Sequence, residues 1–270
     1  MTDPSAEAGA AGGADTRSQA AIRVVDLTME YPGGVRALEA VGFDVPSGEL
    51  TSIIGPSGCG KTTTLKAMAG LLEPSSGQVI VQGRVTHGPG PERAFVFQDF
   101  ALIPWATVLR NVAFGLELRG VPRQEREGVA REYIAKTNLT GFENAYPHQL
   151  SGGMRQRVGL ARALAVDADI LLMDEPFASV DEQIRRKFQE DLLTLLSEER
   201  KTVVFVTHSI EEAAYVSDQI VILTRGPGRV SKVVRPKIDR SGPADHIRRS
   251  PGYLDCVETL WGELRDYLEE

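Results

Sequence analysis

The chain has 270 residues with 42% hydrophobic and 25% charged side chains, enough for one large domain or two modest ones around a packed core. Its formal net charge of −7 argues against a nucleic-acid binder that relies on neutralising phosphates. The two cysteines, Cys59 and Cys256, are too few and too isolated for a disulfide framework or a zinc site, and they favour a reducing, cytosolic compartment.

Residues 1–20 are rich in Ala and Gly and carry no apolar run, so they predict a disordered tail rather than a secretory signal. The sequence contains no run of about 18 apolar residues, and the chain is therefore not expected to span a bilayer. Any membrane role has to come through a partner protein.

From residue 50 onward, short apolar runs alternate with helical periodicity, which is typical of parallel strands joined by crossover helices. The predicted strands are residues 50–55, 94–98, 168–176, 202–209 and 218–224. One helix is expected to follow the first strand, and another covers 182–199 with an apolar stripe along one side.

Strand signals disappear between Phe100 and Gln149, where helical patterns broken by Pro and Gly dominate. This predicts a helical insertion in an α/β core, at about residues 99–153. After Pro236 the chain is polar and interrupted by prolines, and a short final helix is expected. We therefore divide the chain into a tail (1–20), a main domain (21–235) and a C-terminal extension (236–270).

The sequence GPSGCGKTT at residues 55–63 matches the phosphate-loop pattern G-x-x-x-x-G-K-[ST], with a predicted strand before it and a predicted helix after it. Glycines at 58 and 60 let backbone N–H groups wrap around phosphates, and the dipole of the following helix adds to the attraction. Lys61 brings a cation to the β- and γ-phosphates, and the Thr62 hydroxyl is suited to bind Mg²⁺. A chance glycine-rich turn would lack this strand–loop–helix context.

Asp174 and Glu175 stand near the end of the apolar strand 168–176. An Asp at the tip of a buried strand can hold Mg²⁺, and the adjacent Glu can orient or deprotonate an attacking water. Alone, the pair would indicate a turn whose acids cap the next helix, but beside a phosphate loop it indicates nucleotide hydrolysis. Gln98, His208 and Tyr31 also have ordinary structural interpretations, and position alone does not decide between these and functional roles.

Ser151, Gly152 and Gly153 stand directly before the basic, amphipathic stretch MRQRVGLARAL. Serine caps a helix in this position, glycine permits a close backbone approach, and free N–H groups at a helix start attract an anion, most readily a phosphate. Residues 55–63 match a phosphate loop better and are expected to bind the chain's own phosphate ligand. No anion from this chain's own site is therefore left for the second site. An isolated SGG would more simply be the cap of a core helix.

In order and approximate spacing, GPSGCGKTT, FQ at 97–98, LSGGMRQR, ILLMDEP and His208 resemble the ATP-binding-cassette (ABC) ATPases, over about residues 22–230. More narrowly, FQDFALIPWATVLRNVAFGLELRG and TRGPGR look like the subunits that serve nitrate, sulfonate, taurine and bicarbonate importers. The resemblance implies an α/β fold with the ABC-ATPase architecture: a P-loop NTPase (RecA-like) core, a helical insertion subdomain and an N-terminal antiparallel β subdomain.

The resemblance also implies a role for each motif. Tyr31 would stack on the adenine of ATP. The phosphates would be held by Gly55, Pro56, Ser57, Gly58, Cys59, Gly60, Lys61, Thr62 and Thr63, and Gln98 would touch the metal or the attacking water. The residues around Mg²⁺ would be Thr62, Gln98 and Asp174. The catalytic residues would be Glu175 as general base together with His208, Lys61 and Gln98.

In this family two cassettes pair head to tail, and the LSGG motif of one covers the ATP of the other. Ser151, Gly152 and Gly153 would therefore bind the partner's γ-phosphate, with Asp181 in the loop between the two sites. After DEPF the family usually has Ser or Gly, then Ala, Leu and Asp, whereas here the run is ASVD at 178–181. Asp181 is retained, but a hydroxyl expected at Ala178 is lost, so the contacts that link the two ATP sites are expected to differ in detail from those of the family.

The leading hypothesis is the ATP-hydrolysing subunit of an importer for a small solute, an anion such as nitrate, sulfonate or taurine. It would act as a homodimer at the cytoplasmic face of the cell membrane, on a separate permease served by an external solute-binding protein, without nucleic acid. The alternative is a non-transport ABC ATPase. A DNA-repair protein would insert long coiled coils between the two halves of the site, and a translation-linked protein would carry two cassettes in one chain.

A hydrophobic run leaves the strand just after Gln98, at residues 100–105. Leu102 and Ile103 can pack in the insertion's own core. Phe100 and Trp105 flank the run and are better candidates for exposure, where aromatic side chains anchor interfaces. We expect a groove here that receives a short cytoplasmic helix of the permease.

Overall fold

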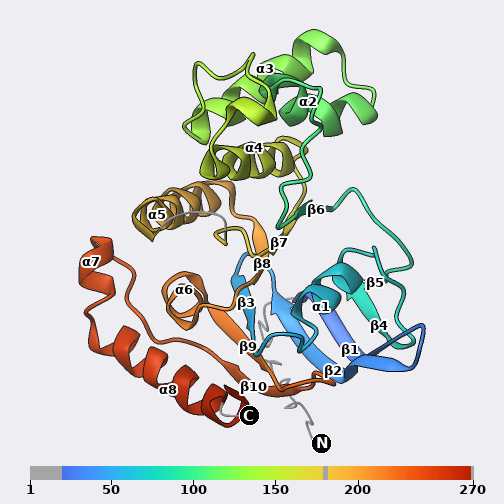
Figure 1. The fold of residues 1–270 in the computed structure, drawn as a ribbon, viewed down its shortest axis with the longest axis vertical. Coiled ribbons are helices and arrows are strands. Elements are labelled where there is room, and N and C mark those ends of the chain that lie inside the picture. The colour runs from blue at the N-terminus through green and yellow to red at the C-terminus, as the bar shows by residue number, and fades with distance from the viewer. Residues whose placement is uncertain (1–19, 179–181, 269–270) are drawn as a thin grey trace, which may run out of the picture.

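The computed structural model describes residues 20–178 and 182–268 and contains two sheets (Figure 1). The first is an antiparallel, 4-stranded sheet in the order β2-β1-β4-β5. Its strands are β1 (Ala20–Tyr31), β2 (Val35–Pro46), β4 (Ser76–Val81) and β5 (Arg84–Val85). Residues 1–19 of the predicted tail lie outside the described residues, and Ala20, assigned to that tail, instead begins β1 and pairs with Pro46.

The second sheet has 6 strands in the order β10-β9-β3-β8-β7-β6. They are β3 (Leu50–Ile54), β6 (Arg93–Val96), β7 (Ile170–Asp174), β8 (Thr202–Val206), β9 (Gln219–Leu223) and β10 (Val230–Val234). All neighbours are parallel except β10, which runs antiparallel to β9. Each strand predicted from the apolar runs is present in this sheet.

Helices cover both faces of the parallel sheet. Because side chains alternate along a strand, Ile170 and Leu172 pack toward α1 (Lys61–Met68) and the antiparallel sheet, whereas Leu171 and Met173 pack into the other core. That second core includes residues of α5 (Glu182–Glu199), α6 (Ile210–Val216) and the helical insertion. The sheet is therefore buried on both sides, which explains its continuous apolar strands.

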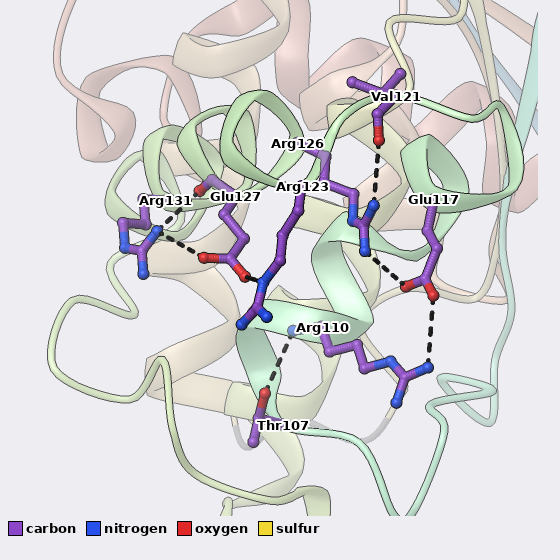
Figure 2. A network of polar contacts seen from close by, with 8 residues as sticks. All are labelled: Thr107, Arg110, Glu117, Val121, Arg123, Arg126, Glu127 and Arg131. Atoms are coloured by element: carbon purple, nitrogen blue, oxygen red, sulfur yellow. Dashed lines mark hydrogen bonds and ion pairs between the residues drawn. The ribbon is translucent and has the colours of Figure 1, made fainter.

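The helical insertion forms the upper part of Figure 1 and consists of α2 (Val108–Leu118), α3 (Arg123–Lys136) and α4 (Gly152–Ala165), with the 3-10 turn η1 (Pro147–Gln149) before α4. The three helices pack on one another. An ion pair joins α3 to α2: Arg126 lies 3.8 Å from Glu117, which Arg110 of α2 also approaches, whereas the 2.7 Å pair between Arg123 and Glu127 lies within α3 (Figure 2). These pairs lie at the surface, where ion pairs contribute little, so the apolar contacts beneath them carry most of the stability.

The chain after Pro236 forms α7 (Ala244–Ile247) and α8 (Pro251–Leu268). The final helix is 18 residues long, not short as predicted from the sequence. Tyr253, Cys256, Leu260 and Leu264 recur at helical spacing and are buried in the same core as α6. This apolar stripe stabilises the full length of the helix against the body of the protein.

Candidate functional site

Four parallel strands end at one edge of the larger sheet, where open α/β sheets bind their ligands. The loop 55–63 follows β3, Gln98 lies beyond the end of β6, Asp174 is the last residue of β7, and His208 follows β8. Strand order brings these groups together from four separate segments of the sequence. They are the candidate site.

The glycine-rich loop closes around the Lys61 side chain. The Lys61 ammonium donates hydrogen bonds to the carbonyl oxygens of Gly55 (2.8 Å) and Pro56 (2.9 Å) and is almost fully buried. Gly60, directly before α1, has φ 93°, and a Cβ there would lie 2.3 Å from Cδ2 of Leu38. Only glycine satisfies both the left-handed backbone and this close approach.

Thr62 and Asp174 meet at the start of α1, where the Thr62 hydroxyl donates to Oδ1 of Asp174 at 2.9 Å. Burial raises the pKa of Asp174; the hydrogen bond from Thr62 opposes this shift, and the negative charge of Glu175 adds to it. A hydroxyl and a carboxylate oxygen side by side are hard oxygen ligands, the kind that Mg²⁺ binds together with substrate phosphates. The residues present therefore fit a Mg²⁺ site.

Glu175 follows with φ 45°, an unusual backbone for a side chain of this size, and its N–H donates to the Val206 carbonyl at 3.0 Å. Its Oε2 atom lies 3.5 Å from Nε2 of Gln98 and 3.4 Å from Nδ1 of His208. This strained backbone leaves the carboxylate within reach of both partners. Such strain is common at functional sites.

Sequence reasoning missed the residues that position His208. The Thr207 hydroxyl donates to Glu212 at 2.5 Å and accepts the Ser209 N–H at 3.0 Å, and Ser209 caps α6 by accepting the Glu212 N–H. Thr207 and Glu212 are buried. The signal was available, because Ser209 followed three residues later by Glu212 is the pattern of a capping box.

Tyr31 ends β1 next to the helix that follows the loop. Its hydroxyl lies 3.1 Å from Oγ1 of Thr63, and the side chain is 38% exposed. A tethered aromatic ring with an open face can stack on a base.

The LSGG motif lies apart from this site. Ser151 is exposed and caps α4 by accepting the Met154 N–H at 3.3 Å, and Gly152 and Gly153 form the first turn of the helix. Figure 1 shows α4 in the helical insertion, well separated from α1. Asp181, with Ser179 and Val180 of the departing run, lies outside the described residues.

The hydrophobic run after Gln98 splits into buried and exposed parts. Trp105 is 77% exposed, as predicted, and Leu102 packs against the core. The prediction for Phe100 is wrong: this residue is half-buried, and its ring lies 5.6 Å from the Arg155 guanidinium. Arg162 donates to the Phe100 carbonyl at 2.8 Å, which fixes this segment on α4.

A parallel sheet, a glycine-rich loop leading into a helix and an acidic strand end beside it define the P-loop class of nucleotide hydrolases. Comparison with known proteins identifies the family within this class. Residues 38–178 match the family model described as ABC transporter. The chain belongs to the ABC transporter family, as its ATP-hydrolysing cassette.

Relatives support this assignment over most of the chain. An uncharacterized ABC transporter ATP-binding protein of Methanocaldococcus jannaschii is 47% identical and covers 93% of both chains. The taurine import ATP-binding protein TauB of Chromobacterium violaceum is 45% identical, over 91% of this chain and 96% of its own. A bacterial ABC transporter cassette solved as a dimer has a TM-score of 0.71 and 34% identity, over 79% of this chain and 98% of that chain. The predicted fold class is confirmed.

Proposed function

We propose that this ATPase powers the uptake of a small anionic solute, of the sulfonate, taurine or nitrate kind, through a separate membrane permease. The observation that carries the ATPase part of the proposal is the 2.9 Å hydrogen bond between Thr62 and Asp174 beside the glycine-rich loop, with Glu175 next in the chain. The names of the taurine-import relatives support the direction of transport and the class of solute. No helix of residues 20–178 or 182–268 is long and apolar enough to cross a membrane.

In the proposed mechanism Tyr31 stacks on adenine while the N–H groups of 57–63 and the Lys61 ammonium hold the phosphates. Thr62, Gln98 and Asp174 would hold Mg²⁺, which when bound would supply positive charge against the phosphate oxygens. Glu175 takes the proton of the attacking water on its Oε2 side, where Gln98 and His208 flank it. The water oxygen bonds to the γ-phosphorus, the bond between this phosphorus and the bridging oxygen of the β-phosphate breaks, and ADP is the leaving group. His208 donates a hydrogen bond to the γ-phosphate during this step.

The charged Asp174 carboxylate lowers the free energy of unfolding of the nucleotide-free protein, because it is buried beside Glu175. We expect Asp174→Asn to abolish Mg²⁺-dependent ATPase activity yet raise Tm by about 2–4 °C, the equivalent of ~1 kcal/mol for a chain of this size. Since the folded-state pKa of Asp174 is raised, wild-type protein regains this stability as pH falls through that raised pKa, and the recovery is complete below the unfolded carboxyl pKa. The Tm advantage of the variant should therefore shrink on acidification in thermal scans; a variant less stable than wild type at pH 7 contradicts the assignment.

The exposed start of α4 supports a homodimer in which each cassette completes the other's site. Ser151, Gly152 and Gly153 present N–H groups and a hydroxyl to the outside, far from the chain's own loop. The solved cassette with the same fold is a dimer. Asp181 belongs to the same proposed interface.

Trp105 supports a docking surface for the permease, which would keep the protein at the cytoplasmic face of the membrane, with a solute-binding protein on the other side. Asn111 is fully buried and holds the preceding loop by bonds with the Ile103 N–H (2.8 Å) and the Ala106 carbonyl (3.0 Å). The loop therefore presents an exposed indole on a fixed backbone. A rigid exposed Trp is an effective interface anchor.

Co-purification from detergent-solubilised membranes tests this function, with Trp105→Ser as the informative variant. The variant should keep basal ATPase activity and folding, since the side chain lies in solvent, and lose about tenfold or more of its permease binding. Trp261→Ser is the matched control, because Trp261 is also exposed but lies on α8. Wild-type protein that captures no membrane protein would favour a non-transport ATPase, and undiminished capture by Trp105→Ser would place docking elsewhere.

A further inference from the structure

The turn between β9 and β10 lies along the outer side of the glycine-rich loop. It contains the sequence TRGPGR at 224–229, which the proposed mechanism does not use. Two hydrogen bonds between Thr224 and Arg229 close the base of the turn. The Thr224 N–H donates to the Arg229 carbonyl at 2.9 Å, and the Arg229 N–H donates to the Thr224 hydroxyl at 3.1 Å. This turn is therefore a defined structure beside the loop.

The end of β9 and the turn approach the loop at three successive points. A Cβ on Gly55 would lie 2.7 Å from the Leu223 carbonyl oxygen, and a Cβ on Gly226 would lie 3.5 Å from that of Gly58. The closest approach is at Gly228, where a Cβ would lie 2.0 Å from the Cys59 carbonyl oxygen. No side chain fits at 228 unless the Cys59 peptide moves.

Gly228 is also fixed from its other side. Its N–H donates to the Ala37 carbonyl and its carbonyl accepts the Glu39 N–H, both at 2.9 Å. The intervening Leu38 is the residue whose side chain fills the space beside Gly60. Strand β2 thus holds the turn and the loop at the same place, and Gly228 cannot retreat from Cys59.

Because a peptide unit is planar and trans, the Cys59 carbonyl and the Gly60 N–H point in opposite directions. With the carbonyl against Gly228, the Gly60 N–H is directed away from the turn, at the beginning of α1 where phosphate-binding N–H groups lie. Displacing the carbonyl would rotate this peptide and misdirect the donor.

We propose that Gly228 is a positioning residue for nucleotide binding: it sets the Cys59–Gly60 peptide so that its N–H faces the phosphates. The inference rests on the proposed use of loop 55–63 for ATP. It assigns a role at this site to a residue of the β9–β10 turn, outside the motifs that surround the nucleotide.

The test is Gly228→Ala, with the affinity for ADP measured by calorimetry and Tm measured in parallel. Gly228 lacks a left-handed backbone, so steric contact with Cys59 is the main effect of the added methyl. We expect ADP affinity to fall about ten- to hundredfold, the loss associated with one hydrogen bond to a charged group. Gly226→Ala, in the same turn but with ordinary contacts, should stay within about twofold of wild type.

Gly252→Ala controls for a steric clash as such, because its Cβ would lie 2.4 Å from the Lys237 carbonyl, in the C-terminal extension. It should lower Tm without a matching loss of ADP affinity. Equal ADP affinity in Gly228→Ala and wild type overturns the inference, whereas wild-type protein that binds no ADP overturns the proposed function itself. If Gly228→Ala does not fold, hydrogen exchange of backbone amides in the wild-type protein is the test. We expect ADP to slow exchange of the Gly228 N–H more than exchange of the Arg248 N–H. Equal effects on the two amides would reject the proposal.

Discussion

Replacing Glu175 with Gln is expected to stop ATP turnover while leaving ATP binding intact, so that an ATP-bound dimer accumulates. The carboxylate is held by its neighbours rather than by the loop: Nε2 of Gln98 and Nδ1 of His208 approach its Oε2 atom at 3.5 Å and 3.4 Å. Gln keeps the size of the side chain and its hydrogen bonding but cannot accept the proton of water. Loss of one general base typically costs about 10²–10⁴ in rate. Single-turnover hydrolysis and size-exclusion chromatography with ATP measure both effects.

Lys61→Ala is the contrasting variant, because it should fail at an earlier step. Its ammonium lies inside the loop, bonded to the Gly55 and Pro56 carbonyls, and it supplies the cation for the phosphates. This variant should lose nucleotide affinity itself and form no ATP-bound dimer. Near wild-type hydrolysis by Glu175→Gln would show that another group is the base.

Ser151→Arg is expected to bind ATP as a monomer and fail to hydrolyse it. Ser151 lies on the exposed start of α4, and its hydroxyl bonds to the Met154 N–H rather than to loop 55–63, so a bulky cation there should obstruct only the partner cassette. Mixing with Lys61→Ala should restore one working site per heterodimer, which combines an intact loop from one chain with an intact LSGG motif from the other. Activity of the mixture and of each variant alone measures this.

The matched control is Thr107→Ala, which removes the corresponding cap of the neighbouring helix α2. Loss of a cap costs about 1 kcal/mol, so this variant shows how much of the Ser151→Arg effect is stability alone. Full activity from a strictly monomeric wild-type protein at high dilution would rule out the shared site.

The sequence by itself determined the loop 55–63, the parallel strands of the larger sheet and the helix that begins after Ser151, but not the antiparallel edge strand β10. These features depend on neighbouring residues: a strand, the nine residues 55–63 and the rest of the helix that begins at Lys61 are contiguous, and strands buried on both faces, such as Ile170–Asp174, are apolar up to their last residue. The strands of the antiparallel sheet were not predicted from the periodicity of apolar residues. Strand β1 pairs with β2 through several register shifts, such as that between Val24 and Leu27, and each shift breaks the alternation of apolar and polar residues.

Only the tertiary structure decided how distant segments meet. The sequence predicts exposure for Phe100 and Trp105 alike. In the structure Phe100 packs on Arg155 of α4, whereas Trp105 extends into solvent. Gly228 and Cys59 approach each other because β9 is the neighbour of β3, and this pairing leaves no local pattern in either segment. A motif of consecutive residues can be identified from the sequence alone. Contacts across a sheet depend on strand order, which arises from the packing of the whole chain.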